Sequence, residues 1–255
     1  MKDLLILYPH GLGDCILLTP AMREFYNITG NKVHIATLER FKSAKFFDNC
    51  PYVDNIHYTK DAWHDYPNSA IGFSELQKEW KQFAIDNNYG GVVMPMHSSP
   101  QNKIILNGNF LGIKKFKSYQ TEIFTSEQDR EIAENFVYEK VGKEDFGFIQ
   151  TNTGVPTKDL TEGFGKAWLS KNKDISNFIE IGVDYSHLEF DINVQFEIMK
   201  MSKAICVPDS VFYHACHAVN KKVDFVYFAR GIGIHERVKP LHKNEENVFY
   251  KLEEL

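Results

Sequence analysis

Two short segments of this chain combine residue types that could carry out chemistry. The first reads Pro-His-Gly-Leu-Gly-Asp and contains His10, Gly11, Gly13 and Asp14. Its two glycines permit a tight turn and close approach of a ligand to the backbone. A carboxylate such as Asp14 can act as a general base, although an aspartate near a helix start more often serves only as a cap. The glycine spacing differs from the Gly-x-Gly-x-x-Gly dinucleotide fingerprint, so a nicotinamide-dependent enzyme is disfavoured.

The second segment lies in the C-terminal half, where an apolar run ends in Asp209, Ser210 and Val211. A strand that passes into a helix at this point directs several free backbone amides toward one place, which suits a diphosphate. We expect Asp209 to order the loop, because its carboxylate would repel phosphate. His214 follows on the same helix. With His217 it lacks a third ligand, so no metal site is predicted.

Apolar patterns predict the elements that hold the first segment. A continuous apolar run at residues 4–7 is typical of a strand buried on both faces, and apolar residues recur at helical spacing from Asp14 to Tyr26. Pro20 either kinks this helix or starts a second helix capped by Thr19. Further strands are expected at 32–36, 53–58 and 92–96, and helices at 44–47, 73–86 and 126–140, the last capped by Ser126.

The second half of the chain repeats this alternation. Strands are expected at 146–150, 178–183, 203–207 and 223–228, and helices at 196–201 and 212–219. Such alternation implies parallel sheets joined by right-handed crossovers. A polar, charged run at 140–145 marks the boundary. We therefore predict two α/β lobes, residues 1–142 and 143–240, followed by a tail, residues 241–255, that could pack back on the first lobe.

The composition is that of a folded globular protein, with 43% hydrophobic and 25% charged residues among 255. The net charge of −5 gives no broad basic field, so nucleic-acid binding is not expected, and Lys114, Lys115 and Lys117 are interpreted as a surface loop. The N-terminal apolar run is too short for a signal peptide, and no run is long enough to span a bilayer. The four cysteines lack Cys-x-x-Cys spacing, which predicts free thiols and a cytoplasmic location.

Both segments, and two shorter ones, resemble the heptosyltransferases of lipopolysaccharide synthesis. Residues 6–20 are similar to the opening of that family, an apolar strand followed by Gly-x-Gly-Asp, a short apolar stretch and Pro. Asp209-Ser210, with His214 five residues after the aspartate, resembles the family signature Asp-Ser/Thr-Gly-x-x-His. Residues 51–54 resemble its Pro-x-Val-Asp stretch and residues 166–168 its Lys-x-Trp element. The likeness covers the chain from about residue 4 to 230.

The resemblance implies the GT-B fold, in which two Rossmann-like, doubly wound parallel-sheet lobes face each other across a cleft. The first lobe would bind a glycan or glycolipid acceptor and the second a nucleotide-diphosphate sugar. The implied reaction transfers heptose or a related sugar to an acceptor hydroxyl, with inversion and without a metal or cofactor. By motif position, Asp14 would be the general base, while Lys166 and the amides near Ser210 would stabilise the departing diphosphate.

The chain departs from the family pattern at the donor site. Val211 replaces the glycine expected after Asp209-Ser210, and Asp184 is a weak match for the acidic residue near the donor ribose. Lys158 competes with Lys166 for the phosphate, because both follow Thr153-Gly154. Residues that could read the acceptor are Trp63, Tyr66, His97 and Ser98.

Other functions stay open at this point. A GT-B transferase could act on a different acceptor, such as a modified nucleic-acid base, a protein or a capsular glycan. A catalytically silent sugar-nucleotide or glycan-binding protein could also keep the fold. The presence of both Asp14 and Lys166 argues against silence. The sequence leaves peripheral membrane contact and the oligomeric state open.

Overall fold

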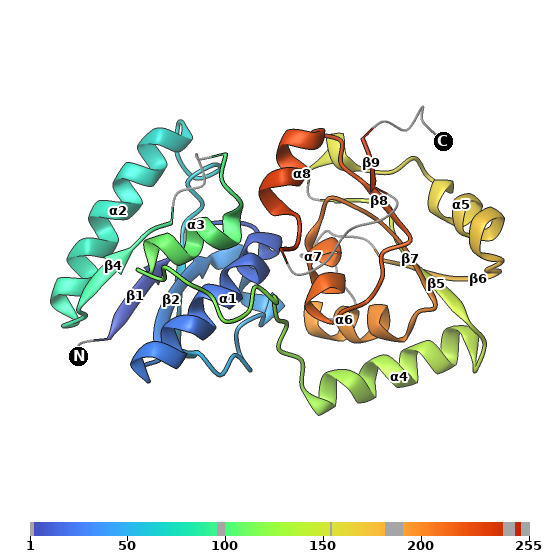
Figure 1. Cartoon of the computed structure of the whole chain (residues 1–255), viewed down its shortest axis with the longest axis horizontal. Helices are drawn as coiled ribbons and strands as arrows, with labels where there is room; N and C mark the ends of the chain where they lie inside the picture. Colours follow the sequence, from blue (N-terminus) through green and yellow to red (C-terminus); the bar gives the residue numbers. More distant parts are fainter. Residues whose placement is uncertain (1–2, 96–99, 154, 182–190, 242–247, 251–255) are drawn as a thin grey trace.

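A computed structural model describes residues 3–95, 100–153, 155–181, 191–241 and 248–250. It consists of two α/β lobes that lie side by side, as predicted (Figure 1). The alternation of apolar strands with amphipathic helices thus produced the expected fold class.

The first lobe is built on a four-stranded parallel sheet of order β3-β2-β1-β4. The strands are β1 (Leu4–Leu7), β2 (Val33–Leu38), β3 (Val53–Thr59) and β4 (Gly91–Val93). Ile6 packs on the face covered by α1 (Leu12–Thr29) and α3 (Lys103–Phe110). Its neighbours Leu5 and Leu7 pack on the opposite face, against α2 (Ser69–Asp86). β1 is therefore buried on both faces, which explains its unbroken apolar run.

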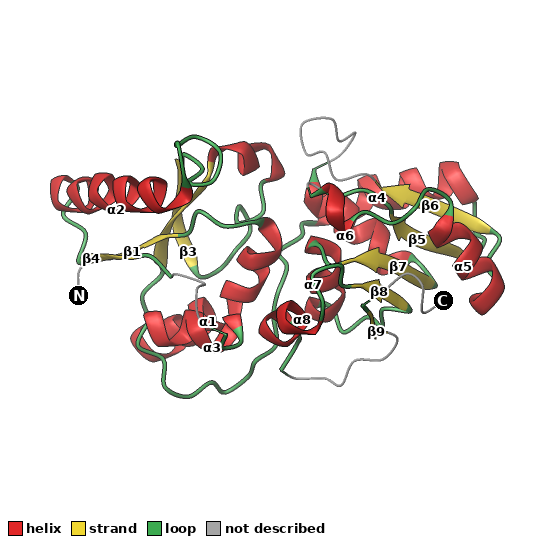
Figure 2. Cartoon of the chain, turned by 90° about the horizontal axis from the view of Figure 1, so that it is seen from above, coloured by secondary structure: helices red, strands yellow, loops and turns green. Residues whose placement is uncertain are grey.

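The second lobe holds a five-stranded parallel sheet of order β6-β5-β7-β8-β9. Its strands are β5 (Phe146–Gln150), β6 (Asn177–Ile181), β7 (Ala204–Pro208), β8 (Phe225–Tyr227) and β9 (Val248–Phe249). Helix α5 (Phe164–Lys173) covers one face, where it packs on Ile149 and Cys206. The other face is covered by α4 (Glu127–Val141), α6 (Ile192–Met201) and α7 (Val211–Ala218) (Figure 2).

The helix after the first glycine segment is continuous. Helix α1 runs from Leu12 to Thr29 with Pro20 inside it, so the alternative of a second helix starting at Pro20 is wrong. The hydroxyl of Thr19 does not cap a helix start. It donates to the carbonyl of Ile16 at 2.8 Å, and it accepts from the amide of Glu122 at 2.9 Å.

Several boundaries differ from prediction. A 3-10 helix, η1 (Glu39–Ala44), precedes the helix expected at 44–47, where the structure has turns. Helix α2 begins at Ser69 because Asn68 caps its start, accepting from the amide of Ile71 at 3.0 Å. Ser126 caps α4 as expected, in a reciprocal capping box with Asp129. Helices α3, α5 and α8 (Ile232–Val238) were not predicted.

The division into lobes also differs from prediction. Helix α4 packs against α6 and β6, so it belongs to the second lobe, although residues 1–142 were assigned to the first. The connection between lobes is the preceding segment, residues 111–126. In the predicted tail, residues 248–249 form β9 and pair with β8, which extends the second sheet; the tail's other described residues are 241 and 250.

One hydrophobic core continues from the first lobe into the second. The same cluster of buried side chains contains Ile6 and Ile16 of the first lobe and Phe148 and Phe212 of the second. Helix α1 packs directly against α7. Polar ties add to this contact: Gln120 of the connecting segment donates to the carbonyls of residues 217 and 218 at the end of α7, at 2.7 and 3.0 Å. These bonds add to the end of α7, where the carbonyl of His217 also accepts from the amide of Asn220 at 3.2 Å.

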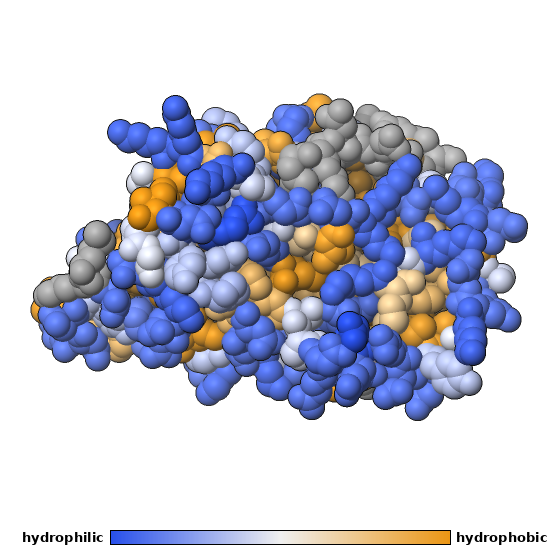
Figure 3. Space-filling model, turned by 60° about the horizontal axis from the view of Figure 1, so that its bottom comes forward, coloured by the Kyte–Doolittle hydropathy of each residue, from blue (hydrophilic) through white to orange (hydrophobic). Residues whose placement is uncertain are grey.

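Exposed hydrophobic side chains are spread over the molecule. On the face drawn in Figure 3, hydrophobic patches lie among hydrophilic residues. The most exposed apolar side chains, Ile28, Trp63, Ile85, Tyr138 and Ile232, come from different elements. Among the described residues, no helix combines the length and apolar character needed to cross a membrane. All four cysteines are buried and free, as predicted.

Candidate functional site

The loop after β1 leaves the first sheet at its topological switch point. β1 lies between β2 and β4, and in open α/β sheets ligands bind beyond the carboxyl ends of the strands where the strand order reverses. His10 is buried in this loop, and its Nε2 donates to the carbonyl of Pro95, after β4, at 2.9 Å. His10 thus joins the two loops that border the switch point. Gly11 follows as the N-cap of α1.

The second sheet has its switch point between β5 and β7. The loop after β5 contains a 3-10 turn, η2 (Pro156–Lys158), and the loop after β7 contains Asp209 and Ser210. Nζ of Lys158 donates to the carbonyl oxygen of Asp209 at 2.9 Å and pairs with its Oδ2 at 2.8 Å. Lys158 therefore lies at the start of α7.

Ser210 caps α7. Its hydroxyl accepts from the amide of Phe212 at 3.3 Å and donates to Oε1 of Gln150, the last residue of β5. Val211, at the glycine position of the family pattern, is the first residue of the helix and is buried. The side chains and strand ends thus fix the orientation of the first turn of α7.

The two predicted segments touch each other. A Cβ atom added to Gly13 would lie 2.7 Å from Cδ2 of His214 and 3.6 Å from the Cα of Val211. The first turn of α1 is therefore packed against the first turn of α7. Because helix N-termini carry partial positive charge and free amides, this arrangement brings together two ends that favour an anion.

Asp14 stands in the first turn of α1, beside this contact. Its carboxylate is only 22% exposed and forms an ion pair with Lys103, the first residue of α3. The hydroxyl of Tyr8 donates to the Asp14 carbonyl at 3.0 Å. Burial, followed by the charge of Asp14, raises the pKa of Tyr8.

His214 is buried between the acidic and basic groups of both lobes. Burial lowers the pKa of His214 to about 4, against the opposing effects of Asp209 and Asp14, whereas Lys103 and Lys158 lower it further. The imidazole is therefore neutral at neutral pH. His217, one turn later, is also buried and packs edge-on against Tyr213 at 4.7 Å between ring centroids.

The remaining predicted donor-site residues are divided between two places. Thr153 orders the loop after β5, since its amide and hydroxyl both donate to Oδ1 of Asp159, at 2.6 and 2.9 Å. Lys166 lies on α5 and pairs with Glu180 of β6 at 3.0 Å, with half of its side chain exposed. Burial tends to raise the pKa of Glu180, but hydrogen bonds from Thr151 and Lys166 lower it overall. Of the two competing lysines, Lys158 contacts Asp209 in the loop after β7, whereas Lys166 contacts Glu180 on β6.

Sequence reasoning missed four residues of this region. They are Tyr8, Lys103, Asn107 and Gln150. Gln150 ends a predicted strand and Tyr8 follows one, so the carboxyl-end rule could have found both. Lys103 and Asn107 stand on a helix that was not predicted.

The predicted acceptor-reading residues are only partly described. His97 and Ser98, together with Gly154 and Asp184, lie outside the described residues. Trp63 is 60% exposed and meets Phe73 edge-on, at 5.5 Å between ring centroids. Tyr66 packs against the hydrophobic cluster that includes Phe73, Leu76 and Trp80 of α2. Among the residues that the structure describes, no group of three or more His, Cys, Asp or Glu side chains is placed to hold a metal ion.

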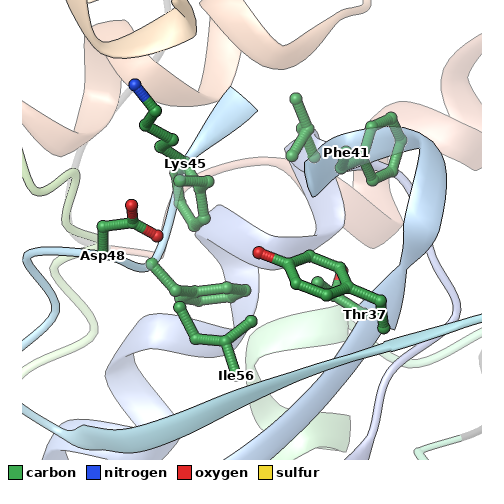
Figure 4. A pocket seen from close by; sticks show the side chains of 9 residues that line it. Thr37, Phe41, Lys45, Asp48 and Ile56 are labelled. Atoms are coloured by element: carbon green, nitrogen blue, oxygen red, sulfur yellow. The ribbon is translucent and has the colours of Figure 1, made fainter. Parts of the chain in front are cut away.

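A small pocket opens next to the glycine segment. Leu12 lines it from α1, Thr37 from near the end of β2 and Ile56 from the middle of β3. Phe41, Lys45 and Asp48 also line the pocket and are labelled with Thr37 and Ile56 in Figure 4. The full lining is Leu12, Thr37, Phe41, Lys45, Phe46, Phe47, Asp48, Ile56 and Tyr58.

No family model and no curated protein sequence matches this chain. Solved structures do. The chain is similar to the Escherichia coli ADP-heptose LPS heptosyltransferase II, with a TM-score of 0.63 and 11% identity over 97% of this chain and 90% of that one. The E. coli heptosyltransferase WaaC with ADP-2-deoxy-2-fluoro heptose gives a TM-score of 0.60 and 13% identity, covering 97% and 92%. A glycosyl transferase family 9 protein from Veillonella parvula gives 0.61 and 12%, covering 89% and 80%.

These matches extend over both lobes and the connection between them, so they concern the whole architecture. Two parallel sheets, flanked by helices and joined through α1 and α7, form that architecture. The chain therefore has the GT-B fold seen in heptosyltransferases and in glycosyl transferase family 9.

Proposed function

We propose that this chain is a glycosyltransferase that moves a sugar from a nucleotide-diphosphate donor to an acceptor hydroxyl. The observation that carries the proposal is the contact between Gly13 and His214, which brings Asp14 of one lobe beside the first turn of α7 in the other. Each segment also lies at the switch point of its own sheet, where α/β proteins bind ligands.

The donor diphosphate would bind at the start of α7. Backbone amides of its first turn, the hydroxyl of Ser210 and the ammonium of Lys158 all lie in this region. On binding, Lys158 would exchange the Asp209 carboxylate for phosphate oxygens. Fixed donors aimed at developing negative charge are usually the largest catalytic contribution, so these groups would stabilise the leaving diphosphate. This supply of positive charge is our reason for proposing transfer without a metal or other cofactor.

Asp14 would act on the acceptor. A sugar hydroxyl is a weak nucleophile, and a positioned carboxylate that takes its proton contributes about a hundred- to ten-thousandfold in rate. As the proton moves to Asp14, the hydroxyl oxygen bonds to the anomeric carbon. The bond from that carbon to the phosphate oxygen breaks, and its electron pair leaves with the diphosphate. We propose a single displacement of this kind, which inverts the anomeric carbon.

The similar E. coli structures name ADP-heptose and a fluorinated ADP-heptose, and they suggest the first donor to test. We propose heptose or a related sugar as the group transferred and a glycan or glycolipid as the acceptor. Lipopolysaccharide biosynthesis in the cytoplasm is the corresponding proposed setting.

The test begins with donor binding. Thermal unfolding is measured with ADP, UDP, GDP and CDP, and we expect one nucleotide to raise the Tm by several degrees, since a ligand at 100 times its Kd stabilises the native state by about 2.7 kcal/mol. The matching nucleotide sugar is then incubated with candidate acceptors, and release of the nucleoside diphosphate is followed.

The Asp14→Asn variant completes the test. It should keep the nucleotide-dependent rise in Tm and lose transfer by about a hundredfold or more, because the amide cannot accept the proton. Binding without turnover in the wild-type protein would instead identify a silent sugar-nucleotide-binding protein. If none of the four nucleotides raises the Tm above that of the protein alone, the donor site is rejected.

A further inference from the structure

The position of Lys103 contradicts the usual electrostatics of a helix. It is the first residue of α3, where the helix dipole disfavours a cation, and its side chain is only 16% exposed. Burying an ammonium group at such a position is costly unless the charge is paired. Its partner is Oδ1 of Asp14 on α1, which is itself mostly buried. Local rules are broken in this way most often at functional sites.

The register of α3 against α1 is fixed by a second buried contact. Asn107 lies one turn after Lys103 and is completely buried. Its Nδ2 donates to the Leu17 carbonyl at 3.1 Å and to the Tyr8 hydroxyl at 3.2 Å. Tyr8 in turn donates to the Asp14 carbonyl at 3.0 Å. Both the backbone and the carboxylate of Asp14 are therefore held from the same face of α3.

The start of α3 is also tied to the second lobe. The Oδ1 atom of Asn102 accepts from the amide of Ile104 at 3.0 Å and so caps α3. Its Nδ2 donates to the carbonyl of Lys239, at the end of α8, at 3.0 Å. The residue next to Lys103 thus links the Asp14 scaffold to the lobe that would carry the donor.

We propose that Lys103 is the positioning residue of the proposed transfer, holding the Asp14 carboxylate ionised and oriented toward the contact between the lobes. This inference rests on the proposed function. Among the described groups that interact electrostatically with Asp14 are Lys103 of α3, His214 of α7, Tyr8 after β1 and Cys15 of α1. The two neutral acids and the neutral imidazole leave Lys103 as the charged group among these four. An opposite charge within about 4 to 6 Å of a carboxyl group lowers its pKa by about 1 to 3 units.

Lys103 keeps its own protons during the reaction. The acceptor proton moves to Asp14, and the ammonium remains beside the carboxyl group throughout. Its effect is to hold Asp14 in the ionised form that can accept a proton, at the expense of some basicity. We therefore expect the ammonium charge, and not merely a side chain that fills space, to be required.

The decisive measurement is a ¹³C NMR titration of the Asp14 carboxyl carbon, assigned by its absence in Asp14→Asn. Lys103→Gln keeps a hydrogen-bond donor and removes the charge, so the Asp14 pKa should rise by about 1 unit or more. Lys103→Arg keeps the charge and should restore most of the wild-type value. The matched control is Lys203→Gln, which removes the same charge from an exposed pair with Asp145 in the second lobe and should leave the Asp14 titration unchanged.

An unchanged Asp14 pKa in a folded Lys103→Gln protein, or a rise that Lys103→Arg does not reverse, would overturn the proposal. Far-ultraviolet circular dichroism checks folding, and if the Gln variant does not fold, the Arg variant against wild type decides alone: its Asp14 pKa must stay within about 0.5 unit of the wild-type value, well inside the shift that loss of the charge predicts.

This titration needs no substrate, so its outcome is separate from that of the nucleotide experiment. A charge-dependent Asp14 pKa in a protein that binds none of the four nucleotides would reject the proposed function and leave the Lys103 pairing intact. Where transfer is observed, Lys103→Gln should lower kcat at least about tenfold and move the acidic limb of its pH profile upward, with ADP binding retained.

Discussion

Two lysines that follow β5 illustrate how partners assign roles to residues of the same type. Lys158 is mostly buried and contacts both the carbonyl and the carboxylate of Asp209. Lys166 is half exposed and pairs with Glu180, on the strand next to β5. An exposed pair of this kind contributes little, whereas a buried ammonium at a helix start can bind phosphate strongly. The diphosphate role implied for Lys166 is therefore better proposed for Lys158.

This assignment predicts different effects for the two substitutions. Lys158→Ala should weaken binding of the preferred nucleoside diphosphate at least about tenfold, equivalent to about 1.4 kcal/mol, because a charge-assisted contact is lost. Lys166→Ala should change binding by less than about twofold. Isothermal titration calorimetry measures both, with thermal unfolding to verify that each variant folds. The reverse order of effects would return the role to Lys166.

At the scale of elements, the site depends on how closely α1 approaches α7. The glycine segment supplies two different properties. Gly11 caps α1 with an ordinary extended backbone, and a Cβ added there would meet no atom within 4 Å. Gly13 has no room for a Cβ, because His214 occupies that space. Only the second glycine is required for the packing of the two helices.

Matched alanine substitutions test this difference. Gly13→Ala should destabilise the protein by about 1 to 3 kcal/mol, as overpacking of a close contact does, and should also weaken nucleotide binding by displacing α7. Gly11→Ala meets no steric obstacle and should cost at most about 1 kcal/mol, because alanine is a poorer N-cap than glycine, and it should leave nucleotide binding unchanged. Urea unfolding of both variants provides the comparison. Equal stability of the two would show that α1 and α7 separate easily.

Much of the order of strands and helices could be predicted, because buried parallel strands appear in a sequence as unbroken apolar runs and long helices as apolar residues at helical spacing. Residues 4–7 and 146–150 are examples of such strands. Helices α3, α5 and α8, of seven to ten residues, were missed because so few residues carry only a weak period, although α6 and α7 of similar length were predicted. The sequence near Lys166 matched a local pattern, but which lysine reaches Asp209 depends on a loop conformation that spacing does not encode. The pairing of Lys103 with Asp14, 89 residues apart, likewise has no local signal.

At the scale of the whole molecule, the two lobes share one core of buried side chains. A histidine with a strongly lowered pKa, His214, is buried where they meet. His214 belongs to α7, touches α1 and is surrounded by groups from both lobes. Its pKa, lowered by burial to about 4, is below the unfolded value of about 6.5. The neutral form therefore stabilises the fold above the unfolded pKa. That contribution is lost as the pH falls through the folded pKa, because the unfolded chain binds the proton first.

This linkage predicts an acid-sensitive contact between the lobes. Between pH 7 and 4, His214 should cost the protein about 3 kcal/mol of stability. A His214→Gln variant should accordingly lose less stability over this range than wild type, although it starts from a lower value at pH 7. Urea unfolding at several pH values gives the slopes, and identical slopes for the two proteins would contradict the linkage.

The core that continues through α1 and α7 restricts how this protein could exchange parts with its structural relatives. A hybrid that joined its N-terminal half to a foreign donor-binding half would place new side chains against Gly13. The foreign half would need a helix whose first turn leaves room for α1 and whose last turn offers a carbonyl to Gln120. Exchange of halves is thus expected to transfer donor specificity only when the contacting faces of α1 and α7 are exchanged as a pair. Changes in donor preference would arise more readily in the loops after β5 and β7, which such a graft need not disturb.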